Sequence, residues 1–191
     1  MSSDIDVLRE LFSNSALVPF TKNVYGKTEV VLEEPSDATH DGYSVTISNV
    51  PDETIVIKTD RFPSPKTIFK PDKGTCKRAD FVIIAYTDKD NWIIYIELKK
   101  GKGNSEKEII QQLQGSQCLI AYCREIGQTF WQRSDFLKLE KYKHCFVSIR
   151  GIGINKKPTS ESPHSGSHNC PENMLKINSP KYLQFKSLIL K

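Results

Sequence analysis

Two carboxylates and an amine lie at the ends of two neighbouring apolar segments. The segment WIIYIELKKG, residues 92–101, ends its apolar run at Glu97, Leu98 and Lys99, and the segment ADFVIIAY, residues 79–86, has Asp80 as its second residue. Side chains alternate between the two faces of a strand, so Glu97 and Lys99 share one face. Two neighbouring carboxylates repel each other unless a proton or a cation lies between them, and oxygen ligands favour a hard ion such as Mg²⁺. With an amine beside them, these groups predict hydrolysis of a phosphodiester.

The polar segment TDKD, residues 87–90, predicts a β-hairpin between the two apolar segments. One two-residue turn places Asp80 opposite Glu97, and the turn one residue later places Asp80 opposite Lys99. Either turn gathers the three side chains on one face, whereas a one-residue error in register would separate them. Both strands are apolar on both faces, so we expect them in the middle of a sheet covered by helices on each side.

The segment after the hairpin predicts an α-helix. Ser105 and Glu108 have the spacing of a capping box, and Gly127 is expected at the C-terminal end. The apolar residues that recur on one face of this helix are Ile109, Leu113, Ile120 and Cys123.

Four glutamines on this helix are candidates for a role at the site. Gln111 and Gln114 fall on the side opposite the apolar stripe, whereas Gln112 and Gln117 flank it. Gln112 is nearer the start of the helix, where the backbone dipoles would meet a phosphate. A plain polar residue at the edge of the core is the alternative for each.

The motif RADFVII, followed by IYIELKKG and a helix rich in glutamine, resembles the PD-(D/E)xK nuclease superfamily over residues 76–126. The resemblance implies an α/β (α+β) protein with a restriction-endonuclease-like fold, in which helices flank a central mixed β-sheet. It implies that Asp80, Glu97 and the backbone carbonyl of Leu98 bind Mg²⁺, with Mn²⁺ as a substitute. Lys99 would activate or orient the attacking water, and Gln112 would position Lys99, the water or the phosphate.

The implied reaction is metal-dependent cleavage of nucleic acid, most often DNA, by an endonuclease of defence, repair or mobile-element biology. A homodimer is compatible with this reaction, since dimers commonly cut both strands of a duplex. The alternative is a catalytically inactive subunit on the same fold, which binds nucleic acid or another protein. A further alternative is a small α/β protein whose acidic first 60 residues contact a basic protein.

Two other acids compete for places at the site. Asp72, in KPDKG, matches the letters of the superfamily motif more literally than Asp80, but the hairpin register would place it beyond the strand, so we expect a loop residue. Glu10 could contribute from the first helix, but it lies about 200° around the helix from Leu8, away from the apolar face. We expect Glu10 on the surface.

The charge of the chain is unevenly distributed. Residues 1–60 hold 11 acidic and 4 basic residues, a formal charge of −7, whereas residues 61–191 hold 12 acidic and 23 basic residues, a charge of +11. The basic part suits a polyanion such as nucleic acid, and a solvated lysine-rich surface is the alternative.

Several basic and aromatic residues could hold nucleic acid. The residues nearest the proposed centre are Lys77, Arg78, Lys100 and Lys102. A second group consists of Lys138, Lys141, Lys143 and Arg150. Trp131 and Tyr142 could stack on bases, although such aromatics more often belong to a core.

The length of 191 residues suits a single domain, residues 1–191. A first helix is expected after Ser3, from the spacing of Ile5, Leu8, Leu11 and Phe12. Residues 27–60 predict a small antiparallel β-meander inserted before the core hairpin, and residues 144–154 predict another buried strand. Residues 156–173 predict an exposed loop. Residues 181–190 fit a strand or a helix.

The five cysteines form no CxxC pair, which favours reduced thiols in a cytoplasmic protein. No basic and apolar leader and no membrane-spanning apolar run is found in the sequence, so we expect no membrane. His164, His168 and Cys170 would bind zinc only if Cys145 or His144 joined them. This zinc pattern is weak beside the predicted magnesium site.

Overall fold

The computed structural model describes residues 3–35, 42–101, 105–151 and 167–189. In these ranges the chain forms two mixed β-sheets and two α-helices, which makes it an α+β protein. Helix α1 spans Asp4–Leu11 and helix α2 spans Glu106–Phe130. The strands are β1 (Phe20–Lys22), β2 (Thr28–Glu34), β3 (Tyr43–Ser48), β4 (Thr54–Lys58), β5 (Phe81–Tyr86), β6 (Asn91–Lys100), β7 (Tyr142–Gly151), β8 (Leu175–Asn178) and β9 (Tyr182–Gln184).

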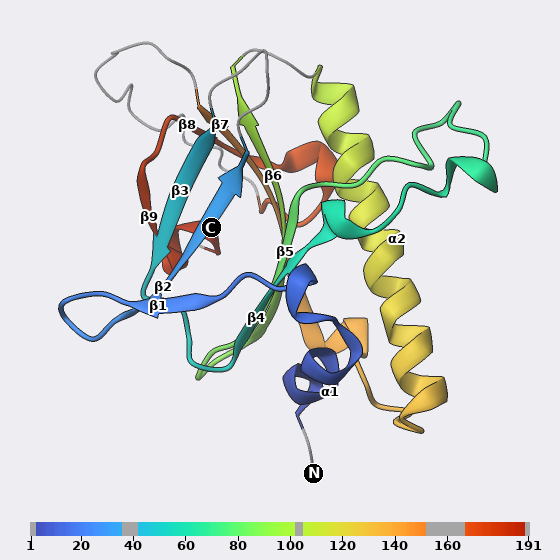
Figure 1. The fold of residues 1–191 in the computed structure, drawn as a ribbon, viewed down its shortest axis with the longest axis horizontal. Helices are drawn as coiled ribbons and strands as arrows, with labels where there is room; N and C mark the ends of the chain where they lie inside the picture. Colours follow the sequence, from blue (N-terminus) through green and yellow to red (C-terminus); the bar gives the residue numbers. More distant parts are fainter. Residues whose placement is uncertain (1–2, 36–41, 102–104, 152–166, 190–191) are drawn as a thin grey trace.

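The larger sheet has the order β4-β5-β6-β7-β8, with β6 at its centre (Figure 1). Strands β4, β5 and β6 are antiparallel, whereas β7 and β8 continue parallel to β6. A parallel neighbour needs a crossover connection, and α2 provides it between β6 and β7. The smaller sheet has the order β1-β2-β3-β9, in which β9 is parallel to β3.

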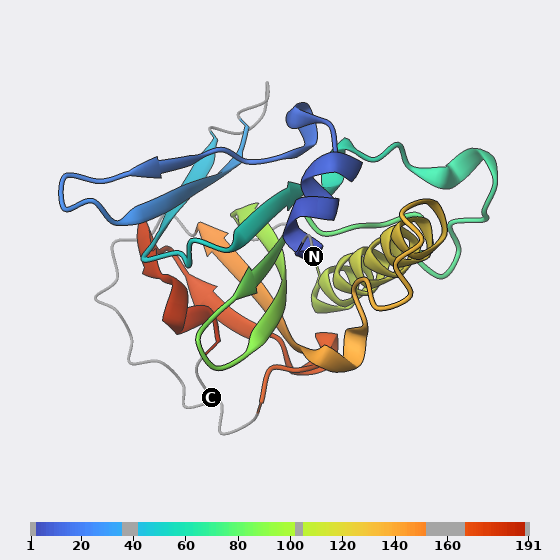
Figure 2. The ribbon, with the colours of Figure 1, turned by 90° about the horizontal axis from the view of Figure 1, so that it is seen from below.

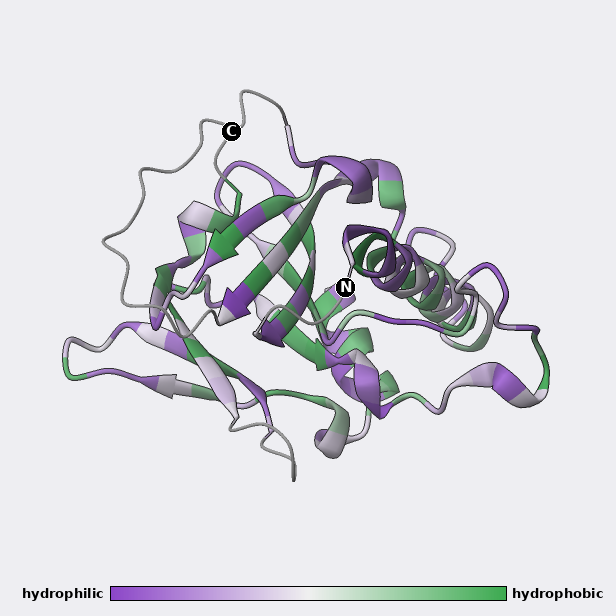
Figure 3. Cartoon of the chain, turned by 90° about the horizontal axis from the view of Figure 1, so that it is seen from above, coloured by the Kyte–Doolittle hydropathy of each residue, from purple (hydrophilic) through white to green (hydrophobic). Residues whose placement is uncertain are grey.

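Alternate residues of β6 face two separate cores. Ile93 and Tyr95 pack with residues of α1 and α2, whereas Ile94 and Ile96 pack with residues of β2 and β3. Figure 2 shows the larger sheet between the two helices and the smaller sheet, and Figure 3 shows hydrophobic and hydrophilic residues alternating along several strands. The expectation of helices on both faces is wrong, because a second sheet buries the second apolar face just as well.

The hairpin between β5 and β6 has the first of the two predicted registers. Its two-residue turn is closed by a backbone hydrogen bond of 3.0 Å from Thr87 N–H to the carbonyl of Asp90. Continued by one residue before β5, the register places Asp80 opposite Glu97. The predicted alignment of the two acids is thus confirmed.

Both helices begin as the sequence predicts. Ser3 and Asp6 form the capping box of α1, and Ser105 and Glu108 form that of α2. The predicted end at Gly127 is wrong, because α2 continues to Phe130. A Cβ atom at Gly127 would lie 2.2 Å from the ring of Phe136, so this glycine permits close packing rather than ending the helix.

The predicted meander over residues 27–60 is only partly correct. Strands β2 and β3 pair as antiparallel neighbours, but β4 pairs with β5 in the larger sheet. The apolar residues of β4 explain the difference, since four successive positions of this strand are buried and need cover on both faces. The segment is therefore no separate insertion, because its last strand belongs to the central sheet.

The predicted exposed loop, residues 156–173, lies partly outside the described residues. Its described part is not simply exposed. His168 is buried, its Nε2 lies 2.8 Å from the carbonyl oxygen of Leu188, and its own carbonyl accepts from the amide of Phe146. Within residues 181–190, both predicted alternatives occur in part, because β9 is followed by a 3₁₀ turn over Phe185–Leu188. Neither helix of the described residues has the length and apolar character needed to cross a bilayer.

Candidate active site

Asp80, Glu97 and Lys99 come together at one end of the hairpin, on the face covered by α2. This face is identified by Val82 of β5 and Tyr95 of β6, which pack with α2 in one core. Asp80 and Glu97 keep the same alternation as these neighbours. The juxtaposition of the three polar residues follows from the register alone.

Hydrogen bonds from two sides fix the backbone at Asp80. Its carbonyl accepts from the amide of Thr59 at 2.8 Å, on the β4 side. On the α2 side, the amide of Ala79 lies 2.9 Å from both the carbonyl of Gln112 and the hydroxyl of Ser116. Helix α2 therefore holds Asp80 in place through its backbone.

Gly115 lets α2 approach the segment that leads into Asp80. A Cβ atom at this position would lie 1.8 Å from the carbonyl oxygen of Lys77, a contact that no side chain can make without a shift of the backbone. We expect Gly115→Ala to lower the free energy of unfolding by about 1–3 kcal/mol, despite the better helix propensity of alanine. Urea denaturation checks this prediction, and Lys107→Ala, at an exposed position of the same helix, is the control. An unchanged or raised stability of Gly115→Ala would contradict it.

Glu97 is the most buried acid of the group, with 1% of its surface exposed. Gln112 donates a hydrogen bond to its carboxylate. Its Oε2 atom has no hydrogen-bond partner among the described residues. Burial, and then the neighbouring charge of Asp80, raises the pKa of Glu97 well above its usual value. One oxygen of this carboxylate thus has an unmet need for a proton or a cation.

Asp80 is also an acid with a raised pKa, but one of its carboxylate oxygens accepts a backbone hydrogen bond. The amide of Leu98 donates a hydrogen bond of 2.8 Å to its Oδ2. Burial raises the pKa of Asp80 to about 7, although the hydrogen bond from Leu98 and the charge of Lys99 lower it. The family resemblance implied a role for the Leu98 carbonyl, whereas the structure brings the Leu98 amide to Asp80.

The amine of Lys99 is paired with an acid that the sequence did not single out. Its Nζ lies 2.9 Å from Oε1 of Glu34, the last residue of β2, and the other oxygen of Glu34 accepts from the amide of Lys100 at 2.6 Å. The hydrogen bond with Glu34 raises the pKa of Lys99, so the amine stays charged. No pattern in the sequence aligned the end of β2 with that of β6, because the two strands belong to different sheets.

Two polar residues of β7 extend the site beyond the hairpin. Ser148 pairs with Glu97 and Arg150 pairs with Lys99 in the parallel register. The hydroxyl of Ser148 is buried and, among the described residues, has no hydrogen-bond partner. The sequence did carry a signal for both, since Ser148 and Arg150 interrupt an apolar strand with the same spacing as Glu97 and Lys99.

On the far side of Ser148, Lys176 of β8 continues the same row. Its Nζ lies 2.8 Å from Oε2 of Glu106, at the start of α2. Arg150 also acts on Glu106 and helps to lower the pKa of this acid. The row that begins with Asp80 and Glu97 therefore passes through Ser148 and ends with one base, Lys176, whereas Arg150 lies opposite Lys99.

The acids fit a hydrated hard cation. Among the described residues, no three His, Cys, Asp or Glu side chains lie close enough together to hold a metal ion. Mg²⁺ commonly keeps several waters and binds through one or two carboxylates, so Asp80 and Glu97 alone are a sufficient pair. The partnerless oxygen of Glu97 and the raised pKa of both acids indicate a deficit of positive charge that such an ion would correct.

Other candidates lie outside this cluster. Glu10 is exposed and accepts a hydrogen bond of 2.7 Å from the indole of Trp131. Tyr142 is buried, and its hydroxyl donates to Asp4 at 2.7 Å, so it belongs to the core and is not free to stack on a base. Asp72 is an exposed loop residue, as expected.

Several of the basic residues predicted to bind nucleic acid already have partners within the protein. Lys77 lies 3.4 Å from Glu108, and Arg78 donates at 2.6 Å to the carbonyl of Phe62. Lys102 lies outside the described residues, and Lys143 pairs with Asp90 at 2.7 Å. For the zinc pattern, His164 is outside the described residues and His168 faces the carbonyl of Leu188.

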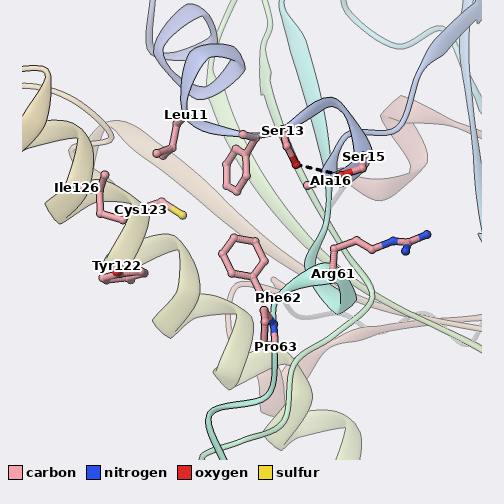
Figure 4. Close-up of a pocket in the computed structure, with 11 residues that line it drawn as sticks. Leu11, Ser13, Ser15, Ala16, Arg61, Phe62, Pro63, Tyr122, Cys123 and Ile126 are labelled. Carbon is pink, nitrogen blue, oxygen red and sulfur yellow. Dashed lines mark hydrogen bonds between the residues drawn. The ribbon is translucent and has the colours of Figure 1, made fainter.

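A pocket of about 460 Å³ lies between α1, α2 and residues 61–63 (Figure 4). Apolar side chains such as Phe12, Phe62 and Ile126 dominate its lining, and Arg61 is the one charged residue there. No carboxylate or histidine lines it, so this pocket offers no side chain suited to hold a hard metal ion or to act as a carboxylate or imidazole base. The cluster around Asp80 and Glu97 is the better candidate.

Comparisons with protein families, with curated proteins and with solved structures find no match for this chain.

Proposed function

We propose that the protein is a metal-dependent nuclease with a restriction-endonuclease-like fold, of the PD-(D/E)xK type, and that its substrate is DNA. The observation that carries the proposal is the buried carboxylate of Glu97, which has a partnerless oxygen and lies opposite Asp80 beside the charged amine of Lys99. Buried acids with raised pKa values in a charged cluster are typical of functional sites. Such a pair is otherwise a cost to stability.

In this proposal, Asp80 and Glu97 hold Mg²⁺ or Mn²⁺, and Gln112 fixes the orientation of the Glu97 carboxylate. When bound, the ion would polarise the phosphate and acidify water. Lys99 is kept charged by Glu34, so it donates hydrogen bonds to the water or to a phosphate oxygen rather than acting as a free base. Arg150, on the neighbouring strand, adds positive charge where the phosphate would lie.

Cleavage of supercoiled plasmid and of single-stranded DNA tests the proposal directly. We expect nicked or linear plasmid with Mg²⁺ or Mn²⁺, and no product with a chelator. Lys99→Ala should slow cleavage about 10²-fold or more. Lys89→Ala is the matched control, since Lys89 is an exposed lysine at the other end of the same hairpin. An intact substrate under every metal tried would defeat the proposal.

Glu34 is a positioning residue in this mechanism, because it holds the amine of Lys99. We expect Glu34→Gln to slow cleavage about 3- to 10-fold and to move the alkaline limb of the pH–rate profile to lower pH, since the pKa of Lys99 falls without this partner. Glu33→Gln, an exposed neighbour on the same strand, should leave the profile unchanged. A purely structural role for Glu34 would lower the rate without moving the limb.

A second candidate is a nucleic-acid-binding subunit without turnover. The pairing of Lys99 with Glu34 favours it, because this amine contacts neither of the other two acids. Gel-shift and cleavage assays on the same samples separate the two candidates. Retained binding with no cleavage under any metal supports the second candidate.

A further inference from the structure

A loop formed by residues 62–78 connects β4 to the candidate site. Figures 1 and 2 show that it extends beyond α2, on the side away from the smaller sheet. Hydrogen bonds join its two limbs: Arg78 to the carbonyl of Phe62 (2.6 Å), Ser64 Oγ to the carbonyl of Cys76 (3.2 Å), and Thr75 Oγ1 to the carbonyl of Lys70 (2.5 Å). These bonds close the segment into a compact loop of defined shape.

Gln111 of helix α2 contacts residues 73 and 74 of the loop. The side chain of Gln111 donates a hydrogen bond of 3.2 Å to the carbonyl of Lys73. Gly74 has a φ of +80°, and a Cβ atom there would lie 2.6 Å from Gln111. The loop is therefore seated on the same helix that positions Asp80.

Two large apolar side chains project from this loop. Ile68 is 77% exposed and Phe69 is 56% exposed, although both follow directly on a 3₁₀ turn that fixes their backbone. Adjacent exposed apolar residues on an ordered loop are unfavourable in water and commonly belong to a contact surface. Neither side chain contributes to the two cores.

The loop is also strongly basic. Residues 62–78 contain five Lys and Arg and a single acid, Asp72. Lys66, Lys70 and Lys73 are exposed, and none of them makes an ion pair with another described residue. Three unpaired cations around two apolar side chains complement a polyanion that also offers apolar faces, and nucleic acid is such a partner.

The loop is continuous with the candidate site. Its second limb ends at Arg78, and Ala79 and Asp80 follow without a break. The loop and the candidate site are therefore joined by one backbone segment. A shared backbone segment fixes the contact surface relative to the reacting groups.

We propose that the 62–78 loop is a nucleic-acid clamp, in which Lys66, Lys70 and Lys73 contact backbone phosphates and Ile68 and Phe69 contact the faces of unstacked bases. The proposal rests on the proposed function only in taking nucleic acid as the substrate. Apolar side chains wedge between base steps of a duplex or stack on bases of a single strand, and the same residues serve in both cases.

A second copy of the chain is a less suitable partner for the exposed surface of the 62–78 loop than nucleic acid is. Two side chains supply roughly 300 Å² of contact, well short of the roughly 800 Å² that each partner of a stable interface buries. A symmetric dimer through this surface would also place two basic loops against each other.

Fluorescence anisotropy with a labelled duplex and with one of its single strands tests the clamp, with Ca²⁺ in place of Mg²⁺. We expect Ile68→Ser with Phe69→Ser to weaken binding about 5- to 50-fold. Lys66→Glu with Lys70→Glu and Lys73→Glu should reduce the slope of log affinity against log salt by about 2–3. The form of DNA that loses more affinity identifies whether the loop wedges or stacks.

The chain offers matched controls on the hairpin between β1 and β2, which lies on the opposite side of the molecule (Figure 1). Val24→Ser with Tyr25→Ser removes an apolar pair that is even more exposed than Ile68 and Phe69. Lys22→Glu and Lys27→Glu on this hairpin, combined with Lys181→Glu directly before β9, make an equal change of charge at exposed positions. Both control variants should bind nucleic acid more tightly than the loop variants.

Binding by the loop variants equal to that of their controls overturns the clamp. Unchanged binding with a loss of self-association in sedimentation would likewise overturn it, and would assign the loop to a protein contact. Cleavage assays on the same proteins keep the two proposals apart. If the wild type cleaves DNA and the loop variants bind as well as their controls, the clamp alone is defeated. If the loop variants bind more weakly but the wild type cleaves nothing, the nuclease alone is defeated.

Discussion

Glu97→Gln is expected to abolish cleavage and, at the same time, to make the metal-free protein more stable. The substitution keeps the shape of the side chain and removes its charge. Loss of a carboxylate that holds the cation should cost several kcal/mol of transition-state stabilisation, which slows cleavage about 10³-fold or more. Plasmid nicking with Mg²⁺ measures this effect.

The gain in stability has its own physical reason. Oε2 of Glu97 has no hydrogen-bond partner among the described residues, and the hydroxyl of Ser148, its neighbour on β7, has none either. An amide in place of the carboxylate can donate to Ser148 and carries no buried charge. We expect the free energy of unfolding near pH 8 to rise by about 1–3 kcal/mol.

Asp88→Asn is the control, because Asp88 is an exposed acid in the turn of the same hairpin. It should change neither cleavage nor stability. Cleavage by Glu97→Gln within about tenfold of the wild type would exclude Glu97 from the reaction, since a lost metal ligand costs far more. A lower stability would show that the carboxylate is already well satisfied in the free protein.

The site was predictable from the sequence as far as it depends on local periodicity. The alternation of β6 and the two-residue turn together placed Asp80 opposite Glu97, and the capping box placed Gln112 on the first turns of α2. Local rules also predicted β7 as a buried strand, but not its parallel pairing with β6, and its polar residues Ser148 and Arg150 were not connected with the site.

The contribution of Glu34 could not be predicted in this way. It arises where the end of a strand in one sheet meets the end of a strand in another, and local periodicity carries no information about such a contact. Packing of two sheets also explains the error about β4, which looked like part of a local meander and joins the central sheet instead. The predicted helix end at Gly127 was wrong for a related reason, because this glycine is needed for the close contact with Phe136 and not for ending the helix.

The two acids should also make the stability of the metal-free protein depend on pH. Burial raises the pKa of Asp80 to about 7 from an ordinary value of 3.8, and it raises that of Glu97 as well. The folded protein therefore holds protons that the unfolded chain has released. Their stabilising effect is complete below the ordinary pKa values and is lost as the pH rises towards and through about 7.

His144 acts in the opposite direction, because burial lowers its pKa and its contribution to stability grows as the pH rises through its ordinary value. Comparison with a variant isolates the acids from this effect. The double variant Asp80→Asn with Glu97→Gln should lose the decline, whereas Asp88→Asn should keep it.

Between pH 5 and pH 8 we expect the wild type without metal to lose about 2–3 kcal/mol relative to the double variant, or about 4–10 °C in the midpoint of thermal unfolding. Millimolar Mg²⁺ or Ca²⁺ at pH 8 should restore most of this loss, because an ion that binds only the folded protein stabilises it by mass action. The double variant should not respond to either ion. Equal pH profiles for the two proteins, or an equal response to the ions, would mean that Asp80 and Glu97 are neither proton-coupled nor a cation site, and that their position opposite each other serves the fold alone.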